Sequence, residues 1–325
     1  MQGKEASEQE TQKCTAGIDV SKDWLDAHVL PASQSLRVAN NSAGIRRLKR
    51  WLLEHKAGLV AIEATGKWHR ETCRSLVASQ IEVAVTDPYR VRMFAKAQGI
   101  FAKTDRLDAR VLAMFAAVMS PACRPPAPKM LEELQELVTT RTSAVAEETM
   151  VKNQLSAAES AFVKRQLSRR IKQLAAHIED LQRECLKRIK ADEALARRFA
   201  ILISVPGFGE VVAITLLAFL DELGSLTRRK IAALGGLAPI ADDSGQRQGV
   251  RVIWGGRAAV RRIAYLAALS ASRCNKDFKT FYRRLVDSGK QRKVALVALA
   301  RKLIVLANTL IAEDRFWLPI APKSA

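Results

Sequence analysis

The chain has 325 residues, of which 48% are hydrophobic, and this length and apolar content indicate a globular protein of two or three domains. Its 53 Lys and Arg residues outnumber its 33 Asp and Glu residues, which gives a formal net charge of +20. Such a charge indicates a polyanionic partner, for which nucleic acid is the first candidate and an anionic membrane surface the alternative.

Two further features indicate a reducing, aqueous compartment. The five cysteines show no C-x-x-C spacing, which argues against a zinc site and against a disulfide framework. The longest apolar run, residues 211–220, is too short to cross a bilayer, and residues 1–13 are too polar for a signal peptide. We therefore expect a soluble cytoplasmic protein without a membrane partner.

After a disordered tail at residues 1–15, the pattern predicts an α/β domain over residues 16–120. Alternating apolar residues predict three short strands at 16–21, 25–30 and 35–40, joined as an antiparallel meander. The predicted elements that follow are helix 42–56, strand 58–64, helix 67–79, strand 81–86, and helices 89–98 and 105–119. This is the element order of the ribonuclease H-like, RuvC-type mixed sheet, in which the first and fourth strands are neighbours and the last helix packs across them.

The rest of the chain is predicted to be mostly helical. Residues 121–129 are rich in proline and indicate a linker. Residues 130–198 contain almost no Gly or Pro and predict two long helices with heptad-like spacing, which fits either a dimerising coiled coil or a plain helical bundle. Residues 199–318 are expected to form a further helical domain with a glycine-rich loop at 235–256, and residues 319–325 a tail.

The stretch 205-VPGFG-209 predicts a tight turn between two helices. The backbone amides around Gly207 and Gly209 could face a phosphate, as in helix-hairpin-helix motifs that bind DNA. A helix–helix turn with no ligand is the alternative.

Four acidic residues occupy positions that make them candidate metal ligands. Asp19 lies inside an apolar strand, where an uncompensated carboxylate is costly, and Glu63 ends the fourth strand. Asp105 and Asp108 are three residues apart and share a face of their helix. In a ribonuclease H-like sheet these four side chains converge, and four carboxylates suit two Mg²⁺ ions.

Each acid also has a structural interpretation. Asp105 could cap its helix, Asp108 could pair with Arg110, and Asp23, Asp26 and Asp87 are nearby acids without a predicted role in the site. The four acids together, in this element order, favour a metal site.

The loop 238-APIADDSGQRQGVRVIWGGRAAVRR-262 contains a second chemical candidate, Ser244. A serine hydroxyl can attack a phosphodiester when cations clamp the phosphate, although Asp-Asp-Ser-Gly is also an ordinary turn. The loop and the helix that follows it supply the candidate nucleic-acid-binding residues Arg247, Arg251, Arg257, Arg261 and Arg262. Lys and Arg far outnumber acids throughout residues 244–293, so this region is the expected polyanion surface.

Taken in order, GIDVSKDWLD, AIEATGKWHRE, KTDRLDARVLA, VPGFGEVVA, GLAPIADDSG and GGRAAVRR resemble one family. It is the insertion-sequence transposases of the "one-ten" type, also called DEDD transposases and bridge-RNA-guided recombinases, which are relatives of the pilin-gene invertase. The Gly-Gly-Arg stretch at 255–257 is most similar to the subgroup with subterminal inverted repeats.

This resemblance implies a RuvC-like domain with Asp19, Glu63, Asp105 and Asp108 as Mg²⁺ ligands, and a later domain with Ser244 as a nucleophile that forms a phosphoserine link to DNA. It also implies an element-encoded guide RNA that pairs with donor and target DNA. A homo-oligomer with a composite active site is implied as well, with residues 130–198 serving assembly.

Two other functions remain open from the residues alone. A metal-dependent nuclease, such as a Holliday-junction resolvase, would need the four acids but not Ser244, because a metal-activated water would attack instead. A non-catalytic nucleic-acid-binding protein would need the charge but not the acids.

Overall fold

The computed structural model of the chain describes residues 14–102, 104–245 and 249–318. These residues form two compact units, one that ends at Ala127 and one that begins at Pro128. The boundary lies in the proline-rich segment, where residues 120–128 form neither helix nor strand.

The first unit is built on a five-stranded mixed sheet with the order β3-β2-β1-β4-β5. Its strands are β1 (Thr15–Val20), β2 (Trp24–Leu30), β3 (Gln34–Ala39), β4 (Leu59–Glu63) and β5 (Glu82–Thr86). The first three strands are antiparallel, whereas β4 runs parallel to β1 and β5 runs parallel to β4. The predicted strands, and the predicted adjacency of the first and fourth, are confirmed.

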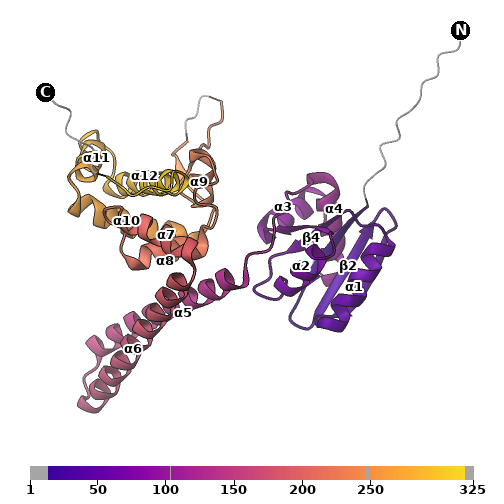
Figure 1. The fold of residues 1–325 in the computed structure, drawn as a ribbon, viewed down its shortest axis with the longest axis horizontal. Helices are drawn as coiled ribbons and strands as arrows, with labels where there is room; N and C mark the ends of the chain where they lie inside the picture. The colour runs from indigo at the N-terminus through magenta and orange to yellow at the C-terminus, as the bar shows by residue number, and fades with distance from the viewer. Residues whose placement is uncertain (1–13, 103, 246–248, 319–325) are drawn as a thin grey trace, which may run out of the picture. The chain divides into compact units, whose positions relative to one another are not determined.

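Four helices cover the two faces of this sheet (Figure 1). They are α1 (Ser42–Glu54), α2 (Arg70–Val77), α3 (Pro88–Ala97) and α4 (Asp105–Met119). Apolar residues of α1 and α2 pack on one face in a core that includes Ile18, Leu48 and Leu76. Apolar residues of α3 and α4 pack on the opposite face around Ala61 and Phe115. The sheet is therefore buried on both sides, as its parallel strands require.

Helix α4 approaches β1 unusually closely. A Cβ atom on Gly17 would lie 2.2 Å from the carbonyl oxygen of Ala109 and 2.3 Å from the amide nitrogen of Ala113. The Thr15 hydroxyl donates a hydrogen bond of 3.1 Å to the carbonyl of Ala113. Glycine at position 17 thus allows the backbone of α4 to lie directly on the strand that carries Asp19.

The second unit begins with a hairpin of two long helices, α5 (Lys129–Ala157) and α6 (Ala161–Ala191). Leu131, Leu134 and Val138, three of the residues with heptad-like spacing, are buried. Helix α5 packs against α6 and against α8 (Glu210–Phe219). Toward the far end of the hairpin, Met150, Phe162 and Val163 are exposed. The two predicted helices are confirmed, and their role in assembly stays a prediction.

The remaining helices form one apolar core with α8. They are α7 (Glu193–Ile203), α9 (Arg228–Leu234), α10 (Ala258–Cys274), α11 (Lys276–Asp287) and α12 (Arg292–Ala312). The expected domain start at residue 199 falls inside α7, which packs against α6, α8 and α12. Among the described residues, α12 is the one helix long and apolar enough to cross a membrane, but half of its apolar window is buried against neighbouring helices. It has the features of a core helix.

The close approach of α4 generates a stability prediction. Gly17→Ala should lower the free energy of unfolding by about 2–3 kcal/mol, because the added methyl group meets helix backbone that cannot move aside cheaply. Urea unfolding of the full chain measures this effect. Gly58→Ala is the matched control, since its Cβ would make only an ordinary contact at 3.7 Å and should change little. Equal effects of the two substitutions would contradict the tight α4–β1 contact.

Candidate active site

Polar side chains form a row across the face of the sheet that α4 covers. Asp19 on β1 pairs in register with Asp26 on β2, and Asp26 pairs in register with Arg37 on β3. On the other side of Asp19, the last parallel pair between Ile18 and Ile62 places Glu63 in the next position of β4. Residues in register across neighbouring strands point to the same face. Asp19, Asp26, Arg37 and Glu63 therefore share one face and one level of the sheet.

The first turn of α4 brings two more acids to this row. Thr104 is the N-cap of the helix, with its hydroxyl accepting a hydrogen bond of 3.3 Å from the amide of Leu107. Interpreting Asp105 as the cap is therefore wrong, because Asp105 is already inside the helix. Asp105 and Asp108 lie three residues apart in the first turn, where the helix dipole favours negative charge.

Three of the predicted acids lie within electrostatic range of the fourth, Asp19. Burial raises the pKa of Asp19 to about 6, and repulsion by Glu63, Asp108 and Asp105 adds to this rise. A hydrogen bond of 3.0 Å from the amide of Val20 acts in the opposite direction without cancelling it. The structure thus places Glu63, Asp105 and Asp108 around Asp19 as a cluster of carboxylates, in which the other three repel the charge of Asp19.

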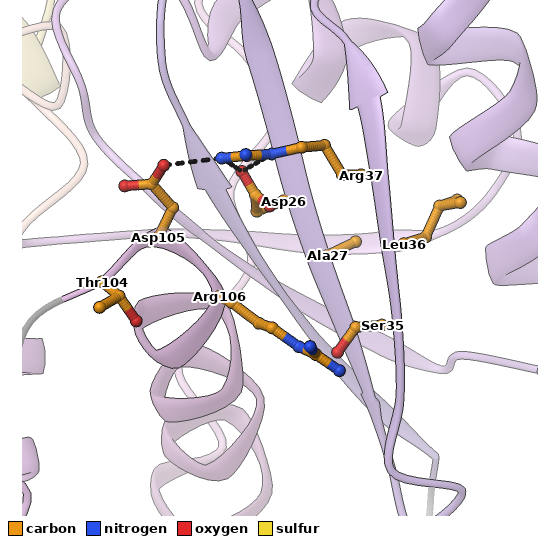
Figure 2. Close-up of a pocket in the computed structure, with 8 residues that line it drawn as sticks. All are labelled: Asp26, Ala27, Ser35, Leu36, Arg37, Thr104, Asp105 and Arg106. Atoms are coloured by element: carbon orange, nitrogen blue, oxygen red, sulfur yellow. Dashed lines mark hydrogen bonds and ion pairs between the residues drawn. The ribbon is translucent and has the colours of Figure 1, made fainter.

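Arg37 contacts one acid of this cluster, Asp105, and also Asp26 (Figure 2). Its Nη2 atom donates to Asp26 at 2.9 Å and to Asp105 at 2.7 Å, and its Nε atom donates to Asp26 at 3.1 Å. In the parts of the chain that the structure describes, no three His, Cys, Asp or Glu side chains stand close enough to share one metal ion. Asp105 is turned toward Arg37 instead.

A pocket of about 490 Å³ opens beside this ion pair. The pocket is lined by Asp26, Ala27, Ser35, Leu36, Arg37, Thr104, Asp105 and Arg106. In Figure 2, the Arg106 side chain extends toward Ser35, away from the two acids. The space has a mixed polar and apolar lining, opens to solvent and lies beside Asp26 and Asp105.

Sequence reasoning assigned no role in the site to Asp26 or to Arg37. The available signal was the alternation in 25-LDAHVL-30, which places Asp26 and His28 on one face of the strand. Because the connection between the two antiparallel strands is short, residues at equal distances from it face each other, which pairs Asp26 with Asp19. Nothing local marked Arg37, because its importance depends on the register of a third strand.

Ser244 lies in the second unit, in the loop between the short strands β6 (Pro239–Ile240) and β7 (Val252–Ile253). The Ser244 side chain is exposed. The preceding Asp243 accepts hydrogen bonds from the amide of Gly249 at 3.0 Å and from Arg251 at 2.8 Å. A Cβ atom on Gly249 would lie 2.0 Å from the carbonyl oxygen of Asp242, so the loop closes tightly there. Asp243 and Gly249 thus shape the turn beside the serine, and Arg251 is paired with Asp243, the residue before Ser244.

The five arginines predicted to bind nucleic acid have different surroundings in the structure. Arg257 donates to Glu222 at 2.7 Å and to the carbonyl of Phe219 at 2.9 Å, so it ties α10 to the end of α8. Burial raises the pKa of Glu222, but the hydrogen bonds from Arg257 outweigh burial and bring this pKa down to about 2. Arg261 donates to the carbonyl of Gly255 at 2.6 Å. Arg262 is exposed, and Arg247 lies outside the described residues. The structure therefore gives Arg257 an internal structural contact, where we expected a phosphate.

The Pro-Gly-x-Gly turn also has a packing explanation. Gly207 has a φ of +91°, and a Cβ atom there would lie 2.8 Å from the carbonyl of Ala267 in α10. Gly209 begins α8 with open space around its Cα, and Glu210 follows in the first turn. Glu210 already places a negative charge at this helix end, where it accepts from Gln182 at 2.7 Å. Phosphate binding by Gly207 and Gly209 stays a prediction.

Comparisons with known proteins match both units. A transposase family model matches residues 16–158, which contain the four acids, and the model of the transposase IS116/IS110/IS902 family matches residues 199–283, which contain Ser244. The pilin gene-inverting proteins of Moraxella bovis and Moraxella lacunata are each 26% identical over 315 residues, which cover 93% of this chain and 97% of the relative. An uncharacterised 42 kDa protein of insertion element IS900 from Mycobacterium paratuberculosis is 29% identical over 134 residues, 40% of this chain and 33% of that protein.

Together the two matched segments cover more than two thirds of the chain. The relatives with a stated activity are recombinases that invert a DNA segment. The chain belongs to the IS110 family of transposases and is a DNA transposase or recombinase.

Proposed function

We propose that this chain cuts and rejoins the donor and target DNA of an insertion sequence, with Ser244 as the nucleophile and Asp19, Glu63, Asp105 and Asp108 as Mg²⁺ ligands. The observation that carries the proposal is the placement of Asp19 and Glu63 at one level of the sheet, with Asp105 and Asp108 in the first turn of the helix that packs on β1, in the unit that the transposase model matches. The strand order β3-β2-β1-β4-β5 supports a ribonuclease H-like, RuvC-type interpretation of this unit.

The donor set fits a divalent cation. Carboxylate oxygens are the ligands that Mg²⁺ prefers, and a cation between them would relieve the repulsion that raises the pKa of Asp19. Two Mg²⁺ ions, when bound, would activate the attacking hydroxyl and stabilise the leaving oxygen. The side chains that have to move for such a site include Asp105, which now faces Arg37.

The serine loop would supply the covalent step. The Ser244 oxygen attacks the phosphorus and displaces a deoxyribose oxygen, so that a serine–phosphate ester replaces one DNA phosphodiester bond and the hydroxyl proton leaves with the displaced oxygen or a base. A deoxyribose hydroxyl from the other DNA end then attacks the same phosphorus, which frees Ser244 and rejoins the strand. Arg251, which is paired with Asp243 next to Ser244 in the chain, would stabilise the phosphate charge.

An assembly with more than one copy of the chain would join these two groups of residues. The acids belong to the first unit and Ser244 to the second, so a composite site can combine them from different protomers. The exposed apolar residues Met150, Phe162 and Val163 near the end of the α5–α6 hairpin support self-association through this hairpin.

A guide RNA encoded by the element completes the proposal. The net charge of +20 suits several nucleic-acid strands at once, because the charge binds RNA and DNA backbones alike. Aromatic residues make up only 6% of the chain, so recognition of sequence would rest on pairing between the RNA and the DNA more than on base stacking by the protein.

A metal-dependent nuclease without a covalent intermediate is the second candidate. It is favoured by the surroundings of Ser244, whose neighbouring carboxylate Asp243 is engaged by Gly249 and Arg251 and is not positioned as a base. In that reaction a metal-activated water would attack the phosphodiester.

The covalent step gives the central experiment. Wild-type protein incubated with element-junction DNA, target DNA, Mg²⁺ and the flanking RNA should yield a protein–DNA adduct that survives denaturation. Ser244→Ala should yield none, because the nucleophile is lost, and Asp108→Asn should yield none while still binding DNA. Cleavage without an adduct, unchanged in Ser244→Ala, would support the nuclease instead.

The raised pKa of Asp19 predicts a pH-dependent stability. The folded state favours the protonated acid, so ionisation of Asp19 destabilises the metal-free protein as pH rises from its ordinary pKa of 3.8 through about 6. Asp19→Asn should therefore be more stable than wild type at pH 7.5 by about 1 kcal/mol, a value reduced for solvent screening, and nearly equal at pH 4. Urea unfolding with a chelator measures both. A stability difference that does not vary with pH would contradict the repulsion.

The two arginines Arg257 and Arg262 should behave differently. Arg262→Gln should weaken DNA binding and reduce the slope of log affinity against log salt by about one, because one phosphate contact is lost. Arg257→Gln should instead lower the free energy of unfolding by about 1–3 kcal/mol, since it leaves Glu222 without its main partner. Fluorescence anisotropy across a salt series and thermal unfolding separate the two effects. An unchanged salt slope in Arg262→Gln would remove this residue from the interface.

A further inference from the structure

One guanidinium nitrogen in the candidate site serves two carboxylates. The Nη2 atom of Arg37 lies 2.9 Å from Asp26 and 2.7 Å from Asp105. Asp26 accepts a second hydrogen bond from Nε of the same arginine at 3.1 Å. Arg37 is thus fixed mainly by Asp26 and reaches Asp105 with one edge of its guanidinium (Figure 2).

The two ends of this bridge differ in burial. The Asp26 side chain is 13% exposed and comes from a central position of the sheet, whereas the Asp105 side chain is 62% exposed and comes from the start of a helix. Arg37 also lies over the ring of Trp24, 5.7 Å from its centroid. Arg37 is therefore held to the sheet by two neighbours, and Asp105 is its more exposed partner.

Asp105 lies between Arg37, which it contacts, and the other acids of the candidate metal site. Asp105 is near enough to Asp19 to raise the pKa of that residue, so it belongs to the carboxylate cluster. Its own carboxylate, however, accepts a hydrogen bond from Arg37. A carboxylate oxygen engaged by a guanidinium has fewer lone pairs available for a cation, and the positive charge of Arg37 repels a cation nearby.

We propose that Arg37 is a positioning residue that competes with a divalent cation for the Asp105 carboxylate, so that the metal site closes only when Asp105 leaves Arg37. This inference rests on the proposed metal site. An exposed ion pair contributes little free energy, so a divalent cation that also binds other carboxylates of the cluster is able to displace it. Arg37, retained by Asp26, stays at the edge of the site after Asp105 has moved.

The matched control is Arg106. It lines the same pocket and carries the same charge, but it extends toward Ser35 and not toward the acids. Replacing either arginine by glutamine removes one positive charge beside the cluster, and only Arg37→Gln removes the hydrogen bond to Asp105.

The experiment is titration calorimetry of Mn²⁺ into the full-length, metal-free protein, with no DNA and no activity readout. Arg37→Gln should bind Mn²⁺ about two- to fivefold more tightly than wild type, the range expected for loss of an exposed ion pair. Arg106→Gln should bind like wild type. Arg37→Lys, which keeps the charge but not the two-acid fork, should lie between wild type and Arg37→Gln. Thermal unfolding in chelator verifies that each variant is folded.

Two groups of results would contradict the proposal, one for the competition for Asp105 and one for the metal site. Equal tightening in Arg37→Gln and Arg106→Gln would mean a general charge effect and overturn the competition for Asp105, as would unchanged affinity in Arg37→Gln. Binding to wild type that Asp19→Asn leaves intact, or no saturable binding at all, would overturn the metal site itself and this inference with it.

Discussion

Helix α4 can lie against β1 only because residue 17 carries no side chain. That contact sets the height of the helix above the sheet and its position along the strand. Its first turn therefore stands beside the level at which Asp19, Asp26 and Glu63 leave their strands. A larger residue at position 17 would lift the helix and separate the acids that it carries from those of the sheet. One glycine in the core thus determines the geometry of the candidate site, although it contributes no ligand.

Much of this arrangement could be predicted from local patterns. Alternation, helical periodicity and element order are enough to predict the five strands, the four helices around them and the nearness of Glu63, Asp105 and Asp108 to Asp19. Arg37 and Asp26 could not be found in this way, because their roles arise from the register of three strands that the pattern does not specify to the residue. The number of charges in the basic region likewise does not predict that Arg257 donates a hydrogen bond to Glu222, because Glu222 lies 35 residues earlier in the chain.

The charges of this protein fall into two kinds. Arg257 and Glu222 satisfy each other inside a helical core, so their contribution is to stability. The carboxylates near β1 repel each other, and their arrangement lowers stability in the absence of a cation. Arg37 and Asp26 partly offset that cost at one edge of the cluster. Strain of this kind is expected where a protein prepares a site for a ligand that it does not itself supply.

The position of helix α12 in the sequence affects the order in which the two units fold during synthesis. Its residues Leu299, Leu303 and Ala307 are fully buried, and it packs against α7, α9, α10 and α11. A chain emerging from the ribosome completes the unit that carries the acids by Ala127, but it cannot close the core behind Ser244 until its last helix is out. The unit that carries the hydroxyl proposed to attack DNA thus completes its core after the unit that carries the acids. A prematurely ended product would retain the carboxylates while lacking an ordered serine unit.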